Sequence, residues 1–185
     1  TDINAGAAVS QPRNIIAVGA GARVRLLETH MGTGTTTQFF NGATMVNVDE
    51  GAKEEHLRHQ IQAANTVHIN TIRAHVATGG SYKSFVLAEG GQMSRDEIQV
   101  ALMGKAASTK LHGVYLGSGS QVLDNTTVIG HQAPGTKSEE NYRGALNDQS
   151  RGVFQGNILV QNGADGTDGR MSNKTILLSD EAEIN

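Results

Sequence analysis

A group of histidines and glutamates near residue 55 has the best spacing for metal binding. Glu55, His56 and His59 lie within five residues of one another. On a helix, residues three apart share a face, so His56 and His59 could both ligate one ion, with a third ligand from the next strand. The alternative is a solvated, charged loop. His68 and His75 lie further along the chain, and His112 and His131 stand alone. The last two adjoin glycines and suit surface or turn positions.

Paired carboxylates could perform acid–base chemistry on a polysaccharide. The acidic clusters are Glu139 with Glu140, and Asp180 with Glu181 and Glu183. Both clusters lie at polar turns or at alternating positions expected to face solvent, so simple solvation explains them. Aromatic platforms for sugars are nearly absent. The sequence therefore predicts no enzyme and assigns no catalytic residue.

Glycine-rich loops do not complete a nucleotide-binding motif. The loop at 19–21 lacks the third glycine of a dinucleotide fingerprint, and that at 104–106 lacks the Ser/Thr and the upstream glycine of a P-loop. No convincing helix follows the loop at 117–120. The Gly/Asp run at 163–169 occurs once, whereas calcium-binding β-roll repeats need tandem copies. All four are interpreted as turns, and no cofactor or metal residue is assigned.

The elements around these residues are short strand-like runs with regular breaks. Val and Ile together outnumber Leu, which favours strands. From residue 79 onward, glycines at 90, 104, 117 and 130 interrupt the apolar runs at a nearly constant spacing. A sandwich of hairpins and a parallel β-helix both fit this spacing. The charged stretch 50–64 departs from it and is expected to form a short amphipathic helix or a loop.

Composition excludes several classes of protein. The chain has 185 residues, 23 glycines, no cysteine and a net charge of −3. These values leave no disulfide framework, no thiolate site and no basic footprint for nucleic acid. No apolar run is long enough to span a membrane. No linker divides the chain, so we expect a single domain over residues 1–185.

The second half of the chain carries a family signature. Four segments follow in order: DNTTVIGH (124–131), SEENYRG (138–144), SRGVFQGNILV (150–160) and TDGRMSNKTILLS (167–179). Together they resemble the core of the SufB/SufD family of iron–sulfur cluster assembly proteins, and the SufD branch more than the SufB branch. The resemblance covers about residues 10–185.

This resemblance implies an all-β fold, a right-handed parallel β-helix, with at most one short helix or loop near 50–64. It also implies a non-catalytic, cytoplasmic scaffold that pairs with a SufB-type subunit and carries the SufC ATPase in the full-length parent. The family's N- and C-terminal helical regions and its interface cysteine and histidine are expected to lie outside this chain. We therefore expect no cofactor within it.

Two other functions remain open at this stage. One is a secreted or surface β-helix that binds or cleaves polysaccharide, and the other is a metal-binding module built on Glu55, His56 and His59. For the β-helix, strand alternation predicts inward Ile98, Val100, Ile158 and Val160, and outward Gln99, Gln121 and Lys174. The strand expected at 175–184 would leave an unpaired edge and allow self-association.

Overall fold

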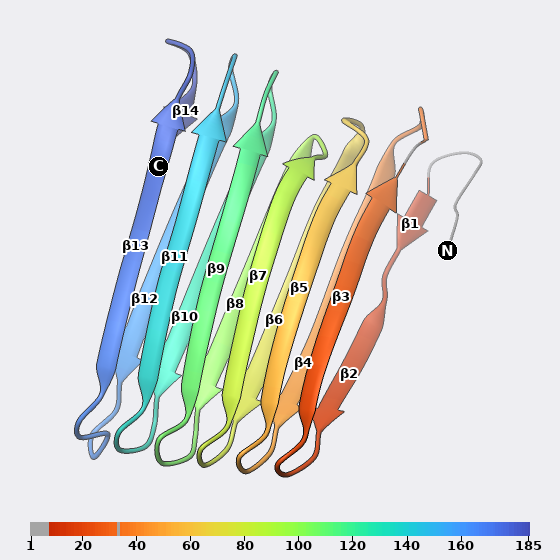
Figure 1. Ribbon diagram of the computed structural model, residues 1–185. Helices are drawn as coiled ribbons and strands as arrows, with labels where there is room; N and C mark the ends of the chain where they lie inside the picture. The colour runs from red at the N-terminus through yellow and green to blue at the C-terminus, as the bar shows by residue number, and fades with distance from the viewer. Residues whose placement is uncertain (1–7, 33) are drawn as a thin grey trace.

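The chain folds into a stack of strands, seen in a computed structural model that describes residues 8–32 and 34–185. No helix occurs in these residues (Figure 1). The strands are β1 (Ala8–Ser10), β2 (Arg13–Val18), β3 (Arg23–Gly32), β4 (Gln38–Val48), β5 (Lys53–Gln62), β6 (Thr66–Val76), β7 (Ser81–Gly90), β8 (Met93–Leu102), β9 (Ser108–Gly117), β10 (Val122–His131), β11 (Lys137–Leu146), β12 (Arg151–Val160), β13 (Asp168–Leu177) and β14 (Glu183–Ile184).

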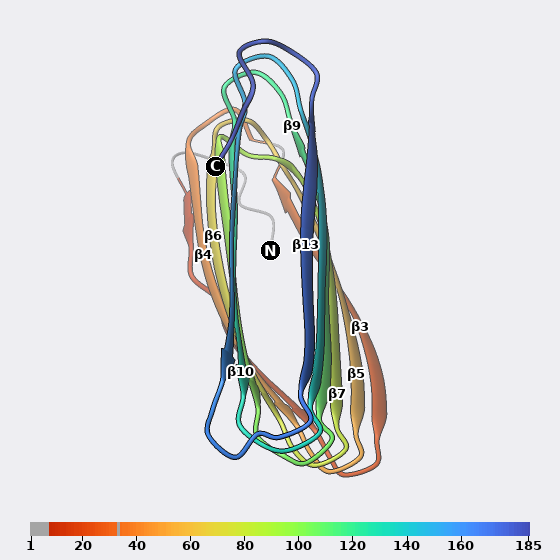
Figure 2. The same cartoon turned by 90° about the vertical axis from the view of Figure 1, so that its left-hand side faces the viewer.

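Successive strands alternate between two sheets. Sheet A has the order β1-β4-β6-β8-β10-β12-β14, with β2 also paired to β4, and sheet B has the order β13-β11-β9-β7-β5-β3. Every pairing is parallel, and each strand from β4 to β12 pairs with the strands two before and two after it. The chain is therefore a parallel β-helix, with one strand in each sheet per turn, and the hairpin sandwich is excluded. Seen along the axis of the stack, the coils superpose, and each coil is a flattened loop with one sheet on either side (Figure 2).

Side chains at alternate positions of each strand fill the space between the sheets. Ile98 and Val100 are buried as predicted. Ile158 and Val160 also occupy inward positions as predicted, but Ile158 is only half-buried and Val160 is 58% exposed. Val160 is in register with the buried His131. However, β14 pairs with β12 only at Arg151 and Gly152, and within residues 8–32 and 34–185 no strand pairs with β12 on that side at Val160.

The charged stretch 50–64 is a strand and not a helix or loop. Residues 53–62 form β5, which pairs with β3 and β7 along its whole length. Its buried positions are Glu54, His56, Arg58, Gln60 and Gln62, a strict two-residue alternation. The helical expectation failed because it relied on Leu57 and Ile61, which point outward and are 38% and 43% exposed.

The outward predictions hold for two of three residues. Lys174 is exposed, and Gln99 is half-buried on the outer face of β8, where it donates to Glu97 (2.6 Å). Gln121 lies instead in the corner before β10 and donates to the carbonyl of Gly91 (2.9 Å). It therefore ties two neighbouring coils together.

The regular glycine spacing reflects the half-turn of the β-helix. Gly90 ends β7 with a φ of 101°, and a Cβ there would lie 2.2 Å from the backbone oxygen of Gln62. Gly104 lies in the next corner, and a Cβ on it would be 2.0 Å from the backbone nitrogen of Thr78. Because the corners of adjacent coils nearly touch, these two positions require glycine.

Candidate functional site: a buried ionisable cluster

Ionisable side chains gather between the sheets in the N-terminal half of the stack. We call them the interior cluster: Glu28 and His30 of β3, His56 and Arg58 of β5, His68 and Asn70 of β6, and Asp96 of β8, with Tyr82 and Ser84 of β7. All of them occupy inward positions of their strands, the positions that also carry the hydrophobic core. The packing of the two sheets therefore brings these ionisable groups into contact inside the fold.

Arg58 and Asp96 form the central ion pair of the interior cluster. Two guanidinium nitrogens donate to the two Asp96 oxygens at 2.5 and 2.8 Å, and both side chains are almost fully buried. Asn70 also donates to Asp96 (3.2 Å), and Arg58 donates to Ser84 (3.3 Å). Burial alone would raise the pKa of Asp96, but the charge of Arg58 and the hydrogen bonds outweigh burial and lower this pKa. The pair stays ionised inside the fold.

A second chain of contacts joins Glu28, His56 and Tyr82. His56 Nε2 is 3.1 Å from a Glu28 oxygen, and His56 Nδ1 is 3.3 Å from the Tyr82 hydroxyl. The nearby His30 (3.5 Å) and the hydrogen bond from His56 lower the pKa of Glu28 strongly, despite burial. An ionised carboxylate only accepts hydrogen bonds, so His56 carries a proton on Nε2. His56 is thereby oriented as a structural bridge between β3 and β7.

His30 and His68 pack as rings. Their centroids lie 5.1 Å apart at 67°, and Phe40 stacks on His68 at 4.6 Å. Burial, with the nearby His30, lowers the pKa of His68 to about 3, so the ring is neutral at physiological pH. In residues 8–32 and 34–185, no group of three His, Cys, Asp or Glu side chains could hold a metal ion.

The predicted metal ligands near residue 55 are split between the two faces of β5. His56 points inward, whereas Glu55 and His59 point outward. Glu55 pairs with Arg25 (2.9 Å) and His59 with Glu89 (2.7 Å). Glu55, His56 and His59 therefore cannot bind one metal ion together, because His56 and His59 are three residues apart on a strand and lie on opposite faces of it.

The histidines beside glycine differ from each other. His112 lies on the outer face of β9, 3.2 Å from Glu139, as expected for a surface residue. His131 is fully buried, and its ring nitrogens contact the hydroxyls of Thr136 (2.7 Å) and Ser138 (2.9 Å). The prediction of a surface or turn position is wrong for His131, because it ends β10 on the inward side.

The acidic clusters do not form a catalytic pair. Glu139 faces outward and binds Lys110 (2.7 Å), whereas Glu140 faces inward and is 2% exposed. The prediction that Glu140 is solvated is therefore wrong. Burial raises the pKa of Glu140 to about 7, and a hydrogen bond from Thr127 partly offsets this rise. Asp180, Glu181 and Glu183 are exposed as expected.

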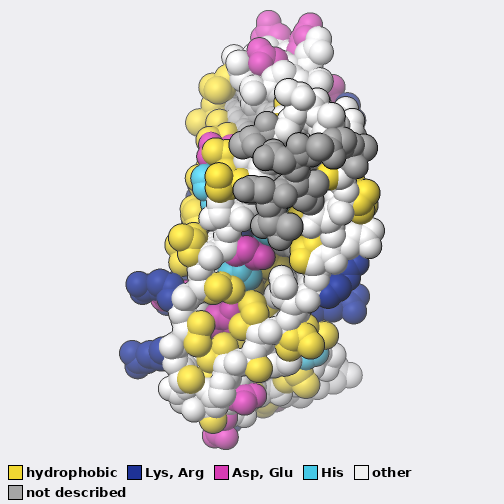
Figure 3. Space-filling model, turned by 90° about the vertical axis from the view of Figure 1, so that its right-hand side faces the viewer, with side chains coloured by type: hydrophobic (Ala, Val, Ile, Leu, Met, Phe, Trp, Pro, Cys, Tyr) yellow, Lys and Arg dark blue, Asp and Glu magenta, His cyan; other side chains and the backbone are white. Residues whose placement is uncertain are grey.

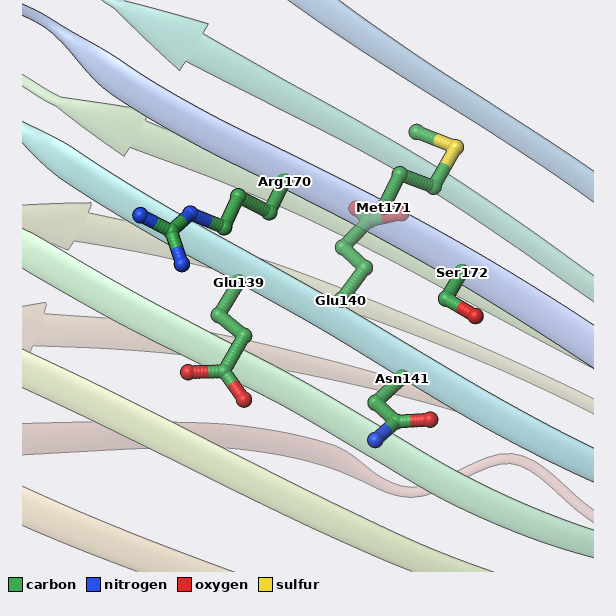
Figure 4. Close-up of a pocket in the computed structure, with 6 residues that line it drawn as sticks. All are labelled: Glu139, Glu140, Asn141, Arg170, Met171 and Ser172. Atoms are coloured by element: carbon green, nitrogen blue, oxygen red, sulfur yellow. The ribbon is translucent and has the colours of Figure 1, made fainter.

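A shallow pocket lies between β11 and β13, next to Glu139 and Glu140. It is lined by Glu139, Glu140, Asn141, Arg170, Met171 and Ser172 (Figure 4). Register places Glu139 opposite Arg170 and Glu140 opposite Met171. The two carboxylates lie on opposite sides of β11, so they cannot act together on one substrate.

The four glycine-rich loops are corners of the β-helix. The segments 19–21, 104–106 and 117–120 each contain a turn between two strands, and 163–169 spans the corner between β12 and the start of β13. Asp168 is bound by Arg170 (3.3 Å). The interpretation of all four as turns is confirmed.

Strand alternation was the signal that could have revealed the interior cluster. In β5 every second residue from Glu54 to Gln62 is polar and buried. A strand with a polar residue at each inward position is easily taken for a solvated segment when its neighbouring strands are not known. Asp96 and Asn70, which complete the cluster, come from distant parts of the chain.

Comparison with known proteins gives a consistent result. The family model for the SUF system FeS cluster assembly SufBD core domain matches residues 1–185. The chain is 25% identical to an iron–sulfur cluster assembly SufBD family protein of Synechocystis, covering 95% of this chain and 40% of that protein. It is 25% identical to the iron–sulfur cluster assembly protein SufD of Escherichia coli (93% and 41%). It is also 24% identical to the chloroplastic protein ABCI7 of Arabidopsis thaliana (96% and 38%).

These matches extend over the whole stack of coils described above. The chain spans about two fifths of the length of the curated relatives it matches. The family model alone covers every coil from β1 to β14. The chain therefore belongs to the SufBD core domain family of iron–sulfur cluster assembly proteins.

Proposed function

We propose that this chain is the core of a SufD-like, non-catalytic scaffold subunit of the Suf machinery. In the full-length parent, this subunit pairs with a SufB-type subunit, carries a SufC-type ATPase and works in the cytoplasm. The family match supports the pathway, and similarity to E. coli SufD supports the branch. The interior cluster supports a structural role, because its charged groups bind one another away from solvent.

The observation that carries the scaffold proposal is the in-register stack itself. Strands of about ten residues pair along their full length from β3 to β13 in sheet B. Each coil contacts its neighbours through two such ladders, which makes a stiff rod. A rod of this kind suits a subunit that transmits a rigid-body displacement from an ATPase to an interface.

The C-terminal end of the stack offers a surface for pairing. β13 is the last strand of sheet B, so one of its edges has no strand partner in the described chain. The exposed apolar residues around it are Leu159, Val160, Ile176, Leu177 and Leu178. The edge differs from the predicted strand 175–184, because β13 ends at Leu177 and a corner precedes β14. In the isolated 185-residue chain, this edge is open to pairing with another strand.

The test is co-purification with two baits, this core and its uncut parent. Each is co-expressed with untagged SufB-type and SufC-type proteins, and the complexes are sized by light scattering. We expect the parent to retain both proteins, and the core to lose the ATPase. A parent that retains neither protein would overturn the scaffold proposal.

A further inference from the structure

The outward face of sheet B is strongly basic. Its 30 outward positions carry nine Lys or Arg and four Asp or Glu residues, a net charge of +5 on a chain of net charge −3. The basic residues are Arg23, Arg25, Lys53, Lys83, Lys110, Lys137, Arg143, Arg170 and Lys174. The outward face of sheet A, by the same count, has four basic and three acidic residues. The positive charge therefore belongs to one face.

Most of this charge lies near the beginnings of the strands. One line of residues crosses all of sheet B in register: Arg25, Glu55, Lys83, Lys110, Glu139 and Arg170. Within it, Glu55 binds Arg25 (2.9 Å) and Lys83 (3.4 Å), and Glu139 binds Lys110 (2.7 Å). Two carboxylates face four cations, so the line keeps an excess positive charge.

An apolar band runs beside this line, nearer the ends of the strands. It consists of Leu27 and Met31 of β3, Leu57 and Ile61 of β5, Phe85 of β7 and Leu116 of β9, all 38–70% exposed. At about 3.3 Å per residue, the band extends roughly 13 Å along the strands, and its four strands cover about 14 Å across. His59 and Glu89, bound to each other (2.7 Å), are the ionisable residues within it. A patch of this kind marks an interaction site.

Figure 3, a view from the N-terminal end, shows this face of sheet B edge-on. On its left-hand side, where sheet B lies, Lys and Arg side chains project below a group of hydrophobic ones. The basic line and the apolar band are thus adjacent parts of one surface.

We propose that the outward face of sheet B binds an amphipathic helix of a partner protein that carries acidic residues along one flank. A helix is about 10–12 Å in diameter, which matches the apolar band, and about ten residues cross its four strands. Its carboxylates would then lie over Lys83, Lys110 and Arg25. This inference goes beyond the scaffold proposal, because it assigns the core a binding face of its own.

The composition of the face favours a helix over other polyanions. Nucleic acid would use the cations and leave the apolar band exposed to water. Trp and Tyr are enriched where proteins meet the membrane–water interface, and the outward positions of sheet B carry neither, with Phe85 as their one aromatic residue. An acidic amphipathic helix uses both parts of the surface.

The probe is a synthetic 14-residue helical peptide with a leucine stripe and glutamates along one flank, and its control has lysines in place of the glutamates. Binding to the 185-residue chain is measured by fluorescence anisotropy at low salt. We expect saturable binding of the acidic peptide and at least tenfold weaker binding of the basic one. Lys83→Glu should weaken binding of the acidic peptide at least tenfold, and Leu57→Asn should weaken this binding as well.

The matched control is Arg73→Glu, which makes the same charge change on the outward face of sheet A and should leave binding unchanged. Thermal unfolding of each variant confirms that it is folded. If Arg73→Glu weakened binding of the acidic peptide as much as Lys83→Glu does, the effect would come from net charge alone, and the proposal would be overturned. No saturable binding, or binding to phosphatidylglycerol vesicles in place of the peptide, would overturn it too.

Discussion

At the scale of single residues, the unusual feature is how much charge the interior of this β-helix contains. Isolated buried charges are costly, and they persist when they are paired and hydrogen-bonded. Arg58 and Asp96 meet both conditions, and so does Glu28 with its two histidines. Glu54 does not, because both of its carboxylate oxygens are buried without a hydrogen-bond partner. The two situations predict opposite responses to mutation.

Replacing Asp96 should destabilise the fold strongly. Asp96→Asn leaves the buried Arg58 charge uncompensated, and we expect the free energy of unfolding to fall by about 3–5 kcal/mol. Arg25→Ala, which breaks the exposed pair with Glu55, should cost at most about 1 kcal/mol. Urea denaturation measures both. Similar losses in the two variants, or an unchanged stability when Arg58→Met is added to Asp96→Asn, would contradict this account.

Replacing Glu54 should stabilise the protein at neutral and higher pH. Burial raises the pKa of Glu54 from 4.5 to about 7, so between these values the folded state keeps a proton that the unfolded state has released. Stability from this group therefore falls as pH rises through that window. Glu54→Gln removes the effect, and its stability relative to wild type should rise by on the order of 2–3 kcal/mol between pH 4.5 and 8.

The control for Glu54 is its outward neighbour. Arg25 and Lys83 lower the pKa of Glu55, so this group does not titrate in the same window. Glu55→Gln should therefore leave the slope of stability between pH 5 and 8 unchanged. A Glu54→Gln variant with the wild-type slope would show that Glu54 is not protonated in the folded state.

At the scale of elements, position in the stack decides what an inward residue contributes. Central strands such as β8 are paired on both sides, and their inward side chains are covered by the coils before and after. β12 is paired on both sides only at its beginning. The same alternation therefore has different consequences in the middle of the stack and at its end.

Truncation of inward residues should show this difference. Ile98→Ala in β8 removes a fully buried side chain and should cost about 2–5 kcal/mol. Val160→Ala in β12 removes a side chain that is 58% exposed and should cost less than about 1 kcal/mol. Both are measured by urea denaturation at one pH. A large loss for Val160→Ala would mean that another copy of the chain covers β12 in solution.

At the scale of the whole molecule, the ends of the stack differ from its middle. The paired ladders run without interruption from β3 to β13, and the exposed apolar residues Ile176, Leu177 and Leu178 follow at the last coil. An unpaired edge beside apolar side chains is a template for another strand.

The isolated 185-residue chain should therefore self-associate at high concentration through β13. Sedimentation velocity should show a concentration-dependent dimer, and Ile176→Lys should shift it to monomer because a charge at the edge opposes strand pairing. Met45→Lys, a similar change on the outward side of β4, serves as the control and should not shift it. A monomer at all concentrations would contradict self-association.

Sequence alone determined the family, the parallel β-helix and the identity of several inward residues. Each glycine break and each family segment at 124–179 is a feature of a short stretch of the chain, so local pattern and resemblance were enough to find them. Ile98 and Val100 followed from alternation within one strand.

The tertiary structure alone decided which polar residues are buried and which inward residues are covered. Arg58 and Asp96 are 38 residues apart, and only the stacking of coils brings them to 2.5 Å. β5 looked helical or solvated because its inward face is polar, and its pairing with β3 and β7 is not local. His131 and Glu140 were misplaced, and the inward Val160 is exposed, for a related reason: burial depends on the neighbouring coils, and a single strand does not reveal them.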